Sequence, residues 1–415
     1  MGSTDLRTLG RRARDAAKVL AASSSAPRDD ALARAAELLE AETDAILAAN
    51  EADRRLGQGA GLSETALDRL TLSAARIAGM AQGLRDVAAL PDPVGEIEDG
   101  WRRPNGLSVS RVRVPLGVVG VIYENRPNVT SDAAGLCLKA GNAAFLRGSS
   151  SALRSNQAVV SVLRRALAKA GLPEDGVLLV EDPSHETAIE FMRLRGLIDC
   201  LVPRGGRELI AALLEHATVP YVLDGDGNCH VYVDAAADLA MAEEIVVNAK
   251  TQRPGVCNAA ESLLVHRAVA GQFLPRVADA LVGVELVGDE RVRAILPQVA
   301  PATEDDFATE FLALKLSVGV VDDLDGAIAH IDRYGSGHSE VIVTGDVTAA
   351  ERFVREVDAA AVLVNASSRF IDGGELGLGA EVGISTQKLH ARGPMGLREL
   401  TCLKWVVRGE GQVRR

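Results

Sequence analysis

The stretch NAKTQRPGVCNAAESLLVH, residues 248–266, places one cysteine on a turn between two regular elements. A helical run ends at the Pro254–Gly255 pair, Cys257 follows, and an apolar, strand-like segment leads away. Lys250 and Arg253 precede the cysteine, and no acidic residue lies between the start of the stretch and Cys257. Positive charge beside an exposed thiol stabilises the reactive thiolate. A lone cysteine in an apolar chain is more often a buried small hydrophobe, so this stretch alone leaves both interpretations open.

Length and composition indicate a soluble protein of two or three domains. At 415 residues the chain is too long for one ordinary core. A hydrophobic fraction of 47% with 25% charged residues is typical of a globular chain and excludes a disordered one. The net charge of -12 argues against a nucleic-acid or membrane-surface partner, and we expect neither.

The cysteine pattern and the apolar runs favour a cytoplasmic location. The N-terminus mixes acidic residues with its arginines and lacks the apolar core of a secretory signal. The longest apolar run, residues 114–123, is too short to span a bilayer. The five cysteines are widely scattered, form no CxxC pair and predict neither disulfides nor a metal site: Cys137, Cys200, Cys229, Cys257 and Cys402.

The first part of the chain predicts helices and then a hairpin. Residues 4–88 carry alanine, leucine and charged residues at helical spacing. Residues 101–114 change to an alternating pattern around Asn105–Gly106, a hairpin turn signal. An alternating hairpin that leaves a helical region often serves as an arm, and an ordinary two-stranded edge fits the pattern equally well.

Residues 116–223 predict a parallel sheet covered by helices on both faces, because short apolar strands alternate with amphipathic helices. Ligands bind such sheets at the carboxyl ends of the strands. Two of these ends, residues 147–151 (RGSSS) and 203–207 (PRGGR), are rich in glycine, serine and arginine, as anion sites are. The expected strands are 117–123, 143–147, 176–180, 197–202 and 218–223, and the clearest helices are 152–170 and 207–216.

A second α/β block follows residue 228. The glycine-rich residues 372–383 are too polar for a core and predict a loop over a site, and residues 400–407 predict a last strand. The expected strands of the block are 229–233, 262–265, 318–321, 341–344 and 361–364, and its expected helices are 235–249 and 268–282.

The order of these motifs resembles the aldehyde dehydrogenase superfamily, and specifically its branch that reduces an acyl phosphate of glutamate. The resemblance covers essentially the whole chain. It rests on five segments: residues 121–143 (VIYENRPNVTSDAAGLCLKAGNA), 229–234 (CHVYVD), 247–258 (VNAKTQRPGVCN), 338–346 (HSEVIVTGD) and 364–397.

The resemblance implies an α/β fold of the aldehyde dehydrogenase type. It implies a Rossmann-type NADPH-binding domain over residues 1–95 and 117–228. A catalytic domain over residues 229–394 would carry the nucleophilic cysteine, and a β-hairpin oligomerisation arm would comprise residues 96–116 and 395–415. The arm implies a homo-oligomer.

The same resemblance implies the catalytic residues. Cys257 stands where the family keeps its nucleophile. Asn125 matches the asparagine whose side-chain amide, with the cysteine backbone N–H, forms the oxyanion hole. From its local sequence alone, Asn125 is a turn residue before Arg126–Pro127.

The cofactor residues are also implied by resemblance. Arg147 stands where relatives place a lysine near the adenine ribose, followed by Ser149 and Ser150. NAD-preferring relatives often carry a glutamate at the position of Ser150, and its absence fits the 2′-phosphate of NADPH. Gly205 and Gly206 match the pyrophosphate turn. Glu310 matches the glutamate that holds the nicotinamide ribose, although a solvated helix-end carboxylate is the alternative.

The implied activity is NADPH-dependent reduction of L-glutamyl 5-phosphate to L-glutamate 5-semialdehyde, with release of phosphate through a Cys257 thioester, in proline biosynthesis. Aldehyde oxidisers use a glutamate to activate water, and residues 221–227 (YVLDGDG) carry apolar residues where it aligns best, with Asp224 close by. A hydrolytic NAD(P)-dependent semialdehyde dehydrogenase and an inactive scaffold protein on the same fold are the alternatives.

Several cations are candidates for the anionic substrate. We expect Lys250, Arg253 and Arg369 to bind it or to lower the thiol pKa. Lys388, His390 and Arg392 form a further group that suits salt bridges equally well. An upstream glutamate kinase is left open as a partner that would deliver the labile acyl phosphate.

Overall fold

The computed structural model describes residues 5–223 and 225–414 and divides into two compact units. The first unit comprises Met1–Leu223, Leu378–Gly383 and Met395–Arg415, and the second comprises Asp224–Gly377 and Ile384–Pro394. The chain thus changes unit after Leu223 and again at Leu378, Ile384 and Met395. The strands of the expected arm cluster with the first unit.

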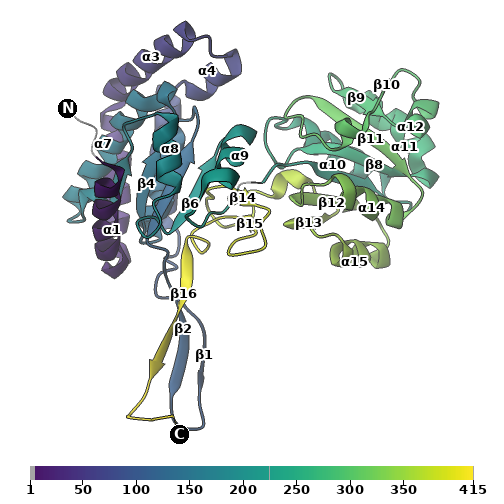
Figure 1. Ribbon diagram of the computed structural model, residues 1–415. Coiled ribbons are helices and arrows are strands. Elements are labelled where there is room, and N and C mark those ends of the chain that lie inside the picture. Colours follow the sequence, from purple (N-terminus) through teal and green to yellow (C-terminus); the bar gives the residue numbers. More distant parts are fainter. Residues whose placement is uncertain (1–4, 224, 415) are drawn as a thin grey trace. The chain divides into compact units, whose positions relative to one another are not determined.

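A parallel sheet in the order β5-β4-β3-β6 forms the centre of the first unit (Figure 1). Strand β3 is buried along its whole length, which is why its sequence VVGVIY is a continuous apolar run. The elements are β3 (Val118–Tyr123), α6 (Asn128–Lys139), β4 (Ala143–Arg147), η1 (Ser150–Ala152), α7 (Leu153–Lys169), η2 (Glu174–Gly176), β5 (Val177–Leu179), α8 (His185–Met192), β6 (Cys200–Arg204) and α9 (Arg207–His216).

This part of the sequence prediction is confirmed with one correction. Residues 218–223, expected as a strand, form only an isolated bridge between Tyr221 and Leu201. Pro220 precedes that bridge and has no N–H to donate, so the ladder does not extend.

Five helices precede the sheet in the described residues 5–96, as their helical spacing predicts. The side chain of Asp5 caps the first of them by accepting the backbone N–H groups of Arg7 and Thr8. The helices are α1 (Leu6–Ala22), α2 (Ser25–Ala41), α3 (Thr43–Gly59), α4 (Glu64–Leu70) and α5 (Ala74–Ala89).

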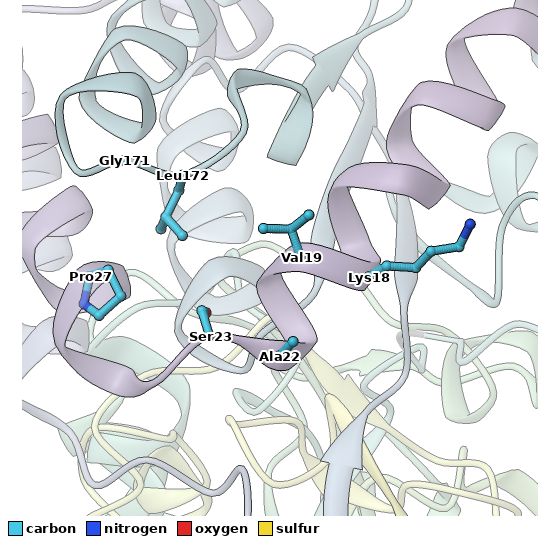
Figure 2. A pocket seen from close by; sticks show the side chains of 7 residues that line it. All are labelled: Lys18, Val19, Ala22, Ser23, Pro27, Gly171 and Leu172. Carbon is cyan, nitrogen blue, oxygen red and sulfur yellow. The ribbon is translucent and has the colours of Figure 1, made fainter.

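A shallow hollow of about 560 Å³ lies beside α1 in this unit (Figure 2). None of the site residues expected from the sequence lines it, so it is no candidate for the active site. The lining residues are Lys18, Val19, Ala22, Ser23, Pro27, Gly171 and Leu172.

The second unit is built on a parallel sheet in the order β10-β9-β11-β8-β7-β12-β13. Its elements are β7 (Cys229–Val233), α10 (Leu239–Thr251), β8 (Ala260–His266), α11 (Arg267–Ala280), β9 (Glu285–Gly288), α12 (Glu290–Ile295), β10 (Ala300–Pro301), α13 (Glu304–Phe307), β11 (Lys315–Val321), α14 (Leu324–Tyr334), β12 (Ser339–Val343), α15 (Val347–Glu356), β13 (Ala361–Val364), η3 (Ser368–Phe370), β14 (Ile384–Ser385) and β15 (Gly393–Pro394).

Alternate side chains along these strands pack into two separate hydrophobic cores. On β7, Val231 and Val233 pack with the apolar residues of α10, α11 and α12, while Tyr232 packs with those of α14 and α15. The same division holds for Leu263 and Leu264 on β8. Helices therefore cover both faces of the sheet, as its near-continuous apolar strands predict.

The predicted hairpin is present and gains a third strand. β1 (Ile97–Arg102) and β2 (Ser108–Pro115) pair antiparallel, with Gly106 of the turn in the left-handed region at φ 91°. β16 (Thr401–Arg408) pairs antiparallel with the other edge of β2. The three strands extend away from the helices of the first unit (Figure 1).

No helix in residues 5–223 or 225–414 has the length and apolar character that a membrane crossing requires.

Candidate active site

Cys257 lies in the turn between α10 and β8 and is partly exposed. Cys137, Cys200 and Cys229 are buried, and burial raises the pKa of the Cys137 and Cys200 thiols to about 12. Such buried thiols stay protonated and unreactive. The position of Cys257 thus favours the nucleophile over the buried-thiol interpretation.

Gly227 and Cys229, at the start of β7, contact the backbone carbonyl of Cys257. The Cys229 thiol donates to the Cys257 carbonyl oxygen at 3.1 Å. Gly227 packs so closely on this carbonyl that a Cβ there would lie 1.7 Å from its oxygen. Only glycine fits this approach, so Gly227 and Cys229 together fix the peptide of the cysteine.

The next residue, Asn258, ties the same turn to η3. Its side-chain amide donates to the Ile371 carbonyl at 2.8 Å, and its own carbonyl accepts from the Ser368 hydroxyl at 2.6 Å. Asn258 and Ser368 are both buried. The turn that carries Cys257 is therefore anchored on two sides before any ligand binds.

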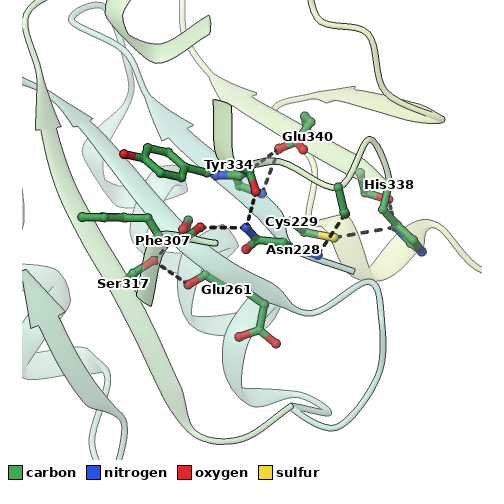
Figure 3. Close-up of polar contacts among 12 residues, drawn as sticks. Asn228, Cys229, Glu261, Phe307, Ser317, Tyr334, His338 and Glu340 are labelled. Carbon is green, nitrogen blue, oxygen red and sulfur yellow. Dashed lines mark hydrogen bonds and ion pairs between the residues drawn. The ribbon is translucent and has the colours of Figure 1, made fainter. Parts of the chain in front are cut away.

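A buried polar layer lies behind the turn, and sequence reasoning did not find it (Figure 3). His338 contacts the Cys229 thiol at 3.7 Å and the Ser339 hydroxyl at 2.8 Å, and burial lowers its pKa to about 4. His230 is paired with Glu340 at 2.9 Å, with both side chains fully buried. The segments 229–234 and 338–346 contain these residues, but nothing in either segment predicts that they meet.

Two guanidinium groups lie near Cys257. Burial lowers the pKa of Arg369 on η3, and the charge of Arg253 lowers it further, while the nearby Cys257 and Asp372 act in the opposite direction. Arg369 Nε also donates to the Gln252 side chain at 2.8 Å. The structure thus brings together three residues that the sequence predicted for one site.

Lys250 has a different environment from the one expected. Its ammonium lies 2.6 Å from Glu261 Oε2, and both side chains are fully buried. Glu261 also accepts the backbone N–H of Leu312 at 3.1 Å. Burial lowers the pKa of Lys250 and raises that of Glu261, and their mutual attraction opposes both shifts. This pairing favours a structural role under the cysteine turn rather than the expected contact with substrate.

Glu310 contacts the segment that precedes β7. Its carboxylate accepts the N–H of Gly227 at 2.9 Å, which ties it to the glycine that packs on the Cys257 carbonyl. The side chain is half-buried rather than fully solvated. The fold therefore connects Glu310 to the cysteine turn through one intervening residue.

Lys388 and Arg392 form surface ion pairs. Asp358 accepts Arg392 at 2.8 Å and also pairs with Lys388. The salt-bridge interpretation is thus the one that the structure favours for both residues.

In the first unit, Asn125 and the RGSSS stretch follow the adjacent strands β3 and β4. Arg147 Nη2 donates to the carbonyls of Pro183 and Ser184 at 2.8 and 3.1 Å, and burial lowers its pKa. Ser150 is exposed, whereas Ser149 is half-buried. The exposed Ser150 thus lies at this strand end beside a half-buried arginine whose guanidinium already donates to two backbone carbonyls.

The glycine pair before α9 binds an anionic group. The Gly206 N–H donates to the Glu124 carboxylate at 3.2 Å, and a Cβ on Gly205 would lie 2.7 Å from that carboxyl carbon. A helix N-terminus that accepts a carboxylate has the donor set that a phosphate requires. Asp224, the residue considered for activating water, lies outside the described residues.

Comparison with known proteins places the chain in a class. A model of the aldehyde dehydrogenase family matches residues 1–308. The chain belongs to this family. A solved acetylating aldehyde dehydrogenase from Geobacillus thermoglucosidasius shares the fold at a TM-score of 0.70 and 17% identity, covering 99% of this chain and 97% of that one.

Full-length relatives narrow the assignment. The chain is 57% identical over 412 residues to gamma-glutamyl phosphate reductase of Moorella thermoacetica and 55% identical over 412 residues to that of Thermobifida fusca, covering 99% of each chain. The crystal structure of gamma-glutamyl phosphate reductase from Thermotoga maritima matches at a TM-score of 0.97 and 48% identity, covering 99% of this chain and 100% of that one. Within the family, the chain belongs to the gamma-glutamyl phosphate reductase group.

Proposed function

We propose that this protein reduces L-glutamyl 5-phosphate to L-glutamate 5-semialdehyde, releasing phosphate, as a step of proline biosynthesis. The observation that carries the proposal is the partly exposed Cys257, anchored beside Arg253 and Arg369, in a chain that matches reductases of this name along its whole length. We also propose that the enzyme acts in the cytoplasm.

The mechanism follows from the chemistry of these groups. The Cys257 thiolate attacks the acyl carbon of the substrate and expels phosphate, which forms a thioester. Arg253 and Arg369 favour the thiolate and attract the anionic substrate. By resemblance to the family, the Asn125 amide and the Cys257 backbone N–H would donate to the oxygen on which negative charge develops, where one such donor contributes roughly 3 kcal/mol. After reduction, the thiohemiacetal collapses and releases the aldehyde and the thiol.

A nicotinamide cofactor, bound as NADPH, would supply the hydride that reduces the thioester. The residues present fit this group, because the turn at Gly205 and Gly206 already donates to a carboxylate. Arg147 and the exposed Ser150 would lie beside the 2′-phosphate, and residues 147–151 (RGSSS) contain no acidic side chain that would repel it. Glu310 would hold the nicotinamide ribose.

Two partner assignments complete the proposal. The three-stranded arm would join copies of the chain into a homo-oligomer. An upstream glutamate kinase would be the source of the acyl phosphate and a candidate partner for its transfer.

The decisive assay follows NADP⁺ reduction with glutamate semialdehyde, with and without inorganic phosphate, and repeats it with NAD⁺. We expect turnover to require phosphate and to be faster with NADP⁺. A Cys257→Ala variant should lose activity by roughly 10⁴-fold or more.

Each alternative gives a different result in this assay. Turnover without phosphate would support a hydrolytic semialdehyde dehydrogenase. Absence of turnover in both directions would support an inactive scaffold, and full activity of Cys257→Ser would contradict the thioester mechanism.

A further inference from the structure

Two serines at the end of β4 contact the side chain of Asn125. The hydroxyls of Ser149 and Ser151 both donate to Asn125 Oδ1, at 3.1 Å for Ser149. The two hydroxyl oxygens are 2.8 Å apart, and the Asn125 backbone N–H donates to Ser149 Oγ at 3.2 Å. These close contacts form a ring of three side chains across two adjacent strand ends, where Ile122 pairs with Arg147.

Proton counting shows what this orientation of the amide leaves available. Each serine hydroxyl has one proton to donate, and both protons are used on Asn125 Oδ1. The N–H groups of the Asn125 amide then make no bond within the ring. With the amide nitrogen inward, these N–H groups would instead be used on the serine oxygens.

The backbone angle of Asn125 and the capping position of Ser149 are consistent with this contact. Asn125 has φ 41°, in the left-handed region that asparagine tolerates better than most residues. Ser149 occupies the N-cap position of η1, yet its side chain makes no capping bond there. Its hydroxyl donates to Asn125 instead of accepting a backbone N–H at the start of the helix, which is what an N-cap serine usually does.

We propose that Ser149 and Ser151 are positioning residues that hold the Asn125 amide by its oxygen, so that its N–H groups are left available to donate to the oxyanion of the substrate. The inference rests on the proposed function, in which Asn125 is the oxyanion donor. It also changes the expectation for Ser149, which the sequence had assigned to the cofactor. Ser150, the exposed serine between them, keeps that assignment.

The test compares the double variant Ser149→Ala/Ser151→Ala with Asn125→Ala in the phosphate-dependent assay. Loss of an oxyanion donor typically lowers kcat by about 10²- to 10³-fold, and we expect that range for Asn125→Ala. The double serine variant should lower kcat by about 10-fold or more, with KM for NADP⁺ unchanged, since the amide is still present but rotates freely. The single variant Ser151→Thr keeps the hydroxyl and should therefore retain most of the wild-type activity.

Combining the variants separates positioning from cofactor binding. In the Asn125→Ala background, loss of the two serines should have little further effect, because there is no amide left to orient. Ser150→Ala should instead raise KM for NADP⁺. Ser161→Ala, an exposed serine on α7, serves as a control for the substitution itself.

Three outcomes would overturn the inference. These are full activity of the double serine variant, a rise in KM for NADP⁺ without a fall in kcat, or the same loss in the presence and absence of Asn125. Full activity of Asn125→Ala would instead contradict the proposed oxyanion role, and the two failures are therefore distinguishable. Thermal unfolding of each variant identifies any loss that comes from misfolding.

Discussion

At the scale of single residues, the Lys250–Glu261 pair is the clearest departure from what local sequence suggests. Lys250 precedes Cys257 in a basic stretch, but its ammonium is fully buried against Glu261. Removing one partner of a buried pair is far more harmful than replacing both, because the remaining charge is left unpaired in the interior.

We therefore expect Lys250→Met to lower the free energy of unfolding by about 3–5 kcal/mol. The double variant Lys250→Met/Glu261→Leu should recover most of this loss. Urea unfolding of the wild type, both single variants and the double variant measures the coupling. If Lys250 holds the substrate phosphate instead, the double variant would be stable but show a raised KM for phosphate.

The candidate site was predictable from the sequence where the signal is local. Cys257 and Arg253 stand four residues apart on one turn, and Arg369 lies in a motif of its own. The ring around Asn125 was not predictable, because its serines are 24 and 26 residues away and their contact depends on the pairing of β3 with β4. The same holds for Glu261, which meets Lys250 only across the cysteine turn.

At the scale of elements, periodicity predicted most strands and helices, because alternation and helical spacing are written in consecutive residues. Strand β7 and helix α9 have the expected bounds. Short elements such as β9 and β10 were missed, since they carry too few residues for a period to show.

The arm carries large apolar side chains that are exposed in the single chain. On one face of β16, Trp405 and Val407 are 59% and 55% exposed, and Trp405 packs edge-on against Trp101 at 5.7 Å. Exposed apolar side chains gathered on one sheet face are typical of an interface.

We expect Val407→Glu to shift the protein toward smaller oligomers, because it places a charge in that apolar face. Sedimentation velocity measures the change. Lys404→Gln, a neighbouring substitution on the opposite face of the strand with the same change in net charge, should leave the oligomer intact. An unchanged sedimentation profile for Val407→Glu would rule out this face as the contact.

At the scale of the whole molecule, the buried histidine layer links stability to pH. The pKa of His338 falls from 6.5 to about 4 on burial, so the unfolded chain binds this proton more readily than the folded one. The stability that neutral His338 provides is complete above pH 6.5 and is lost as the pH falls toward 4.

Between pH 6.5 and 4, protonation of His338 should lower the free energy of unfolding by about 3 kcal/mol. Free energies of unfolding measured across this range should fall less steeply for His338→Gln than for the wild type. His185→Gln, at an exposed position, should follow the wild type. Equal slopes for wild type and His338→Gln would show that His338 is not the group that titrates.

By itself, the sequence determined the α/β class, the order of elements and the identity of the candidate nucleophile, because periodicity and motif are properties of neighbouring residues. Only the tertiary structure decided which polar groups become partners: Lys250 with Glu261, Cys229 with the Cys257 carbonyl, and Ser149 with Asn125. Such contacts join segments that are distant in the chain, and parallel strands bring them together only after the whole crossover has folded.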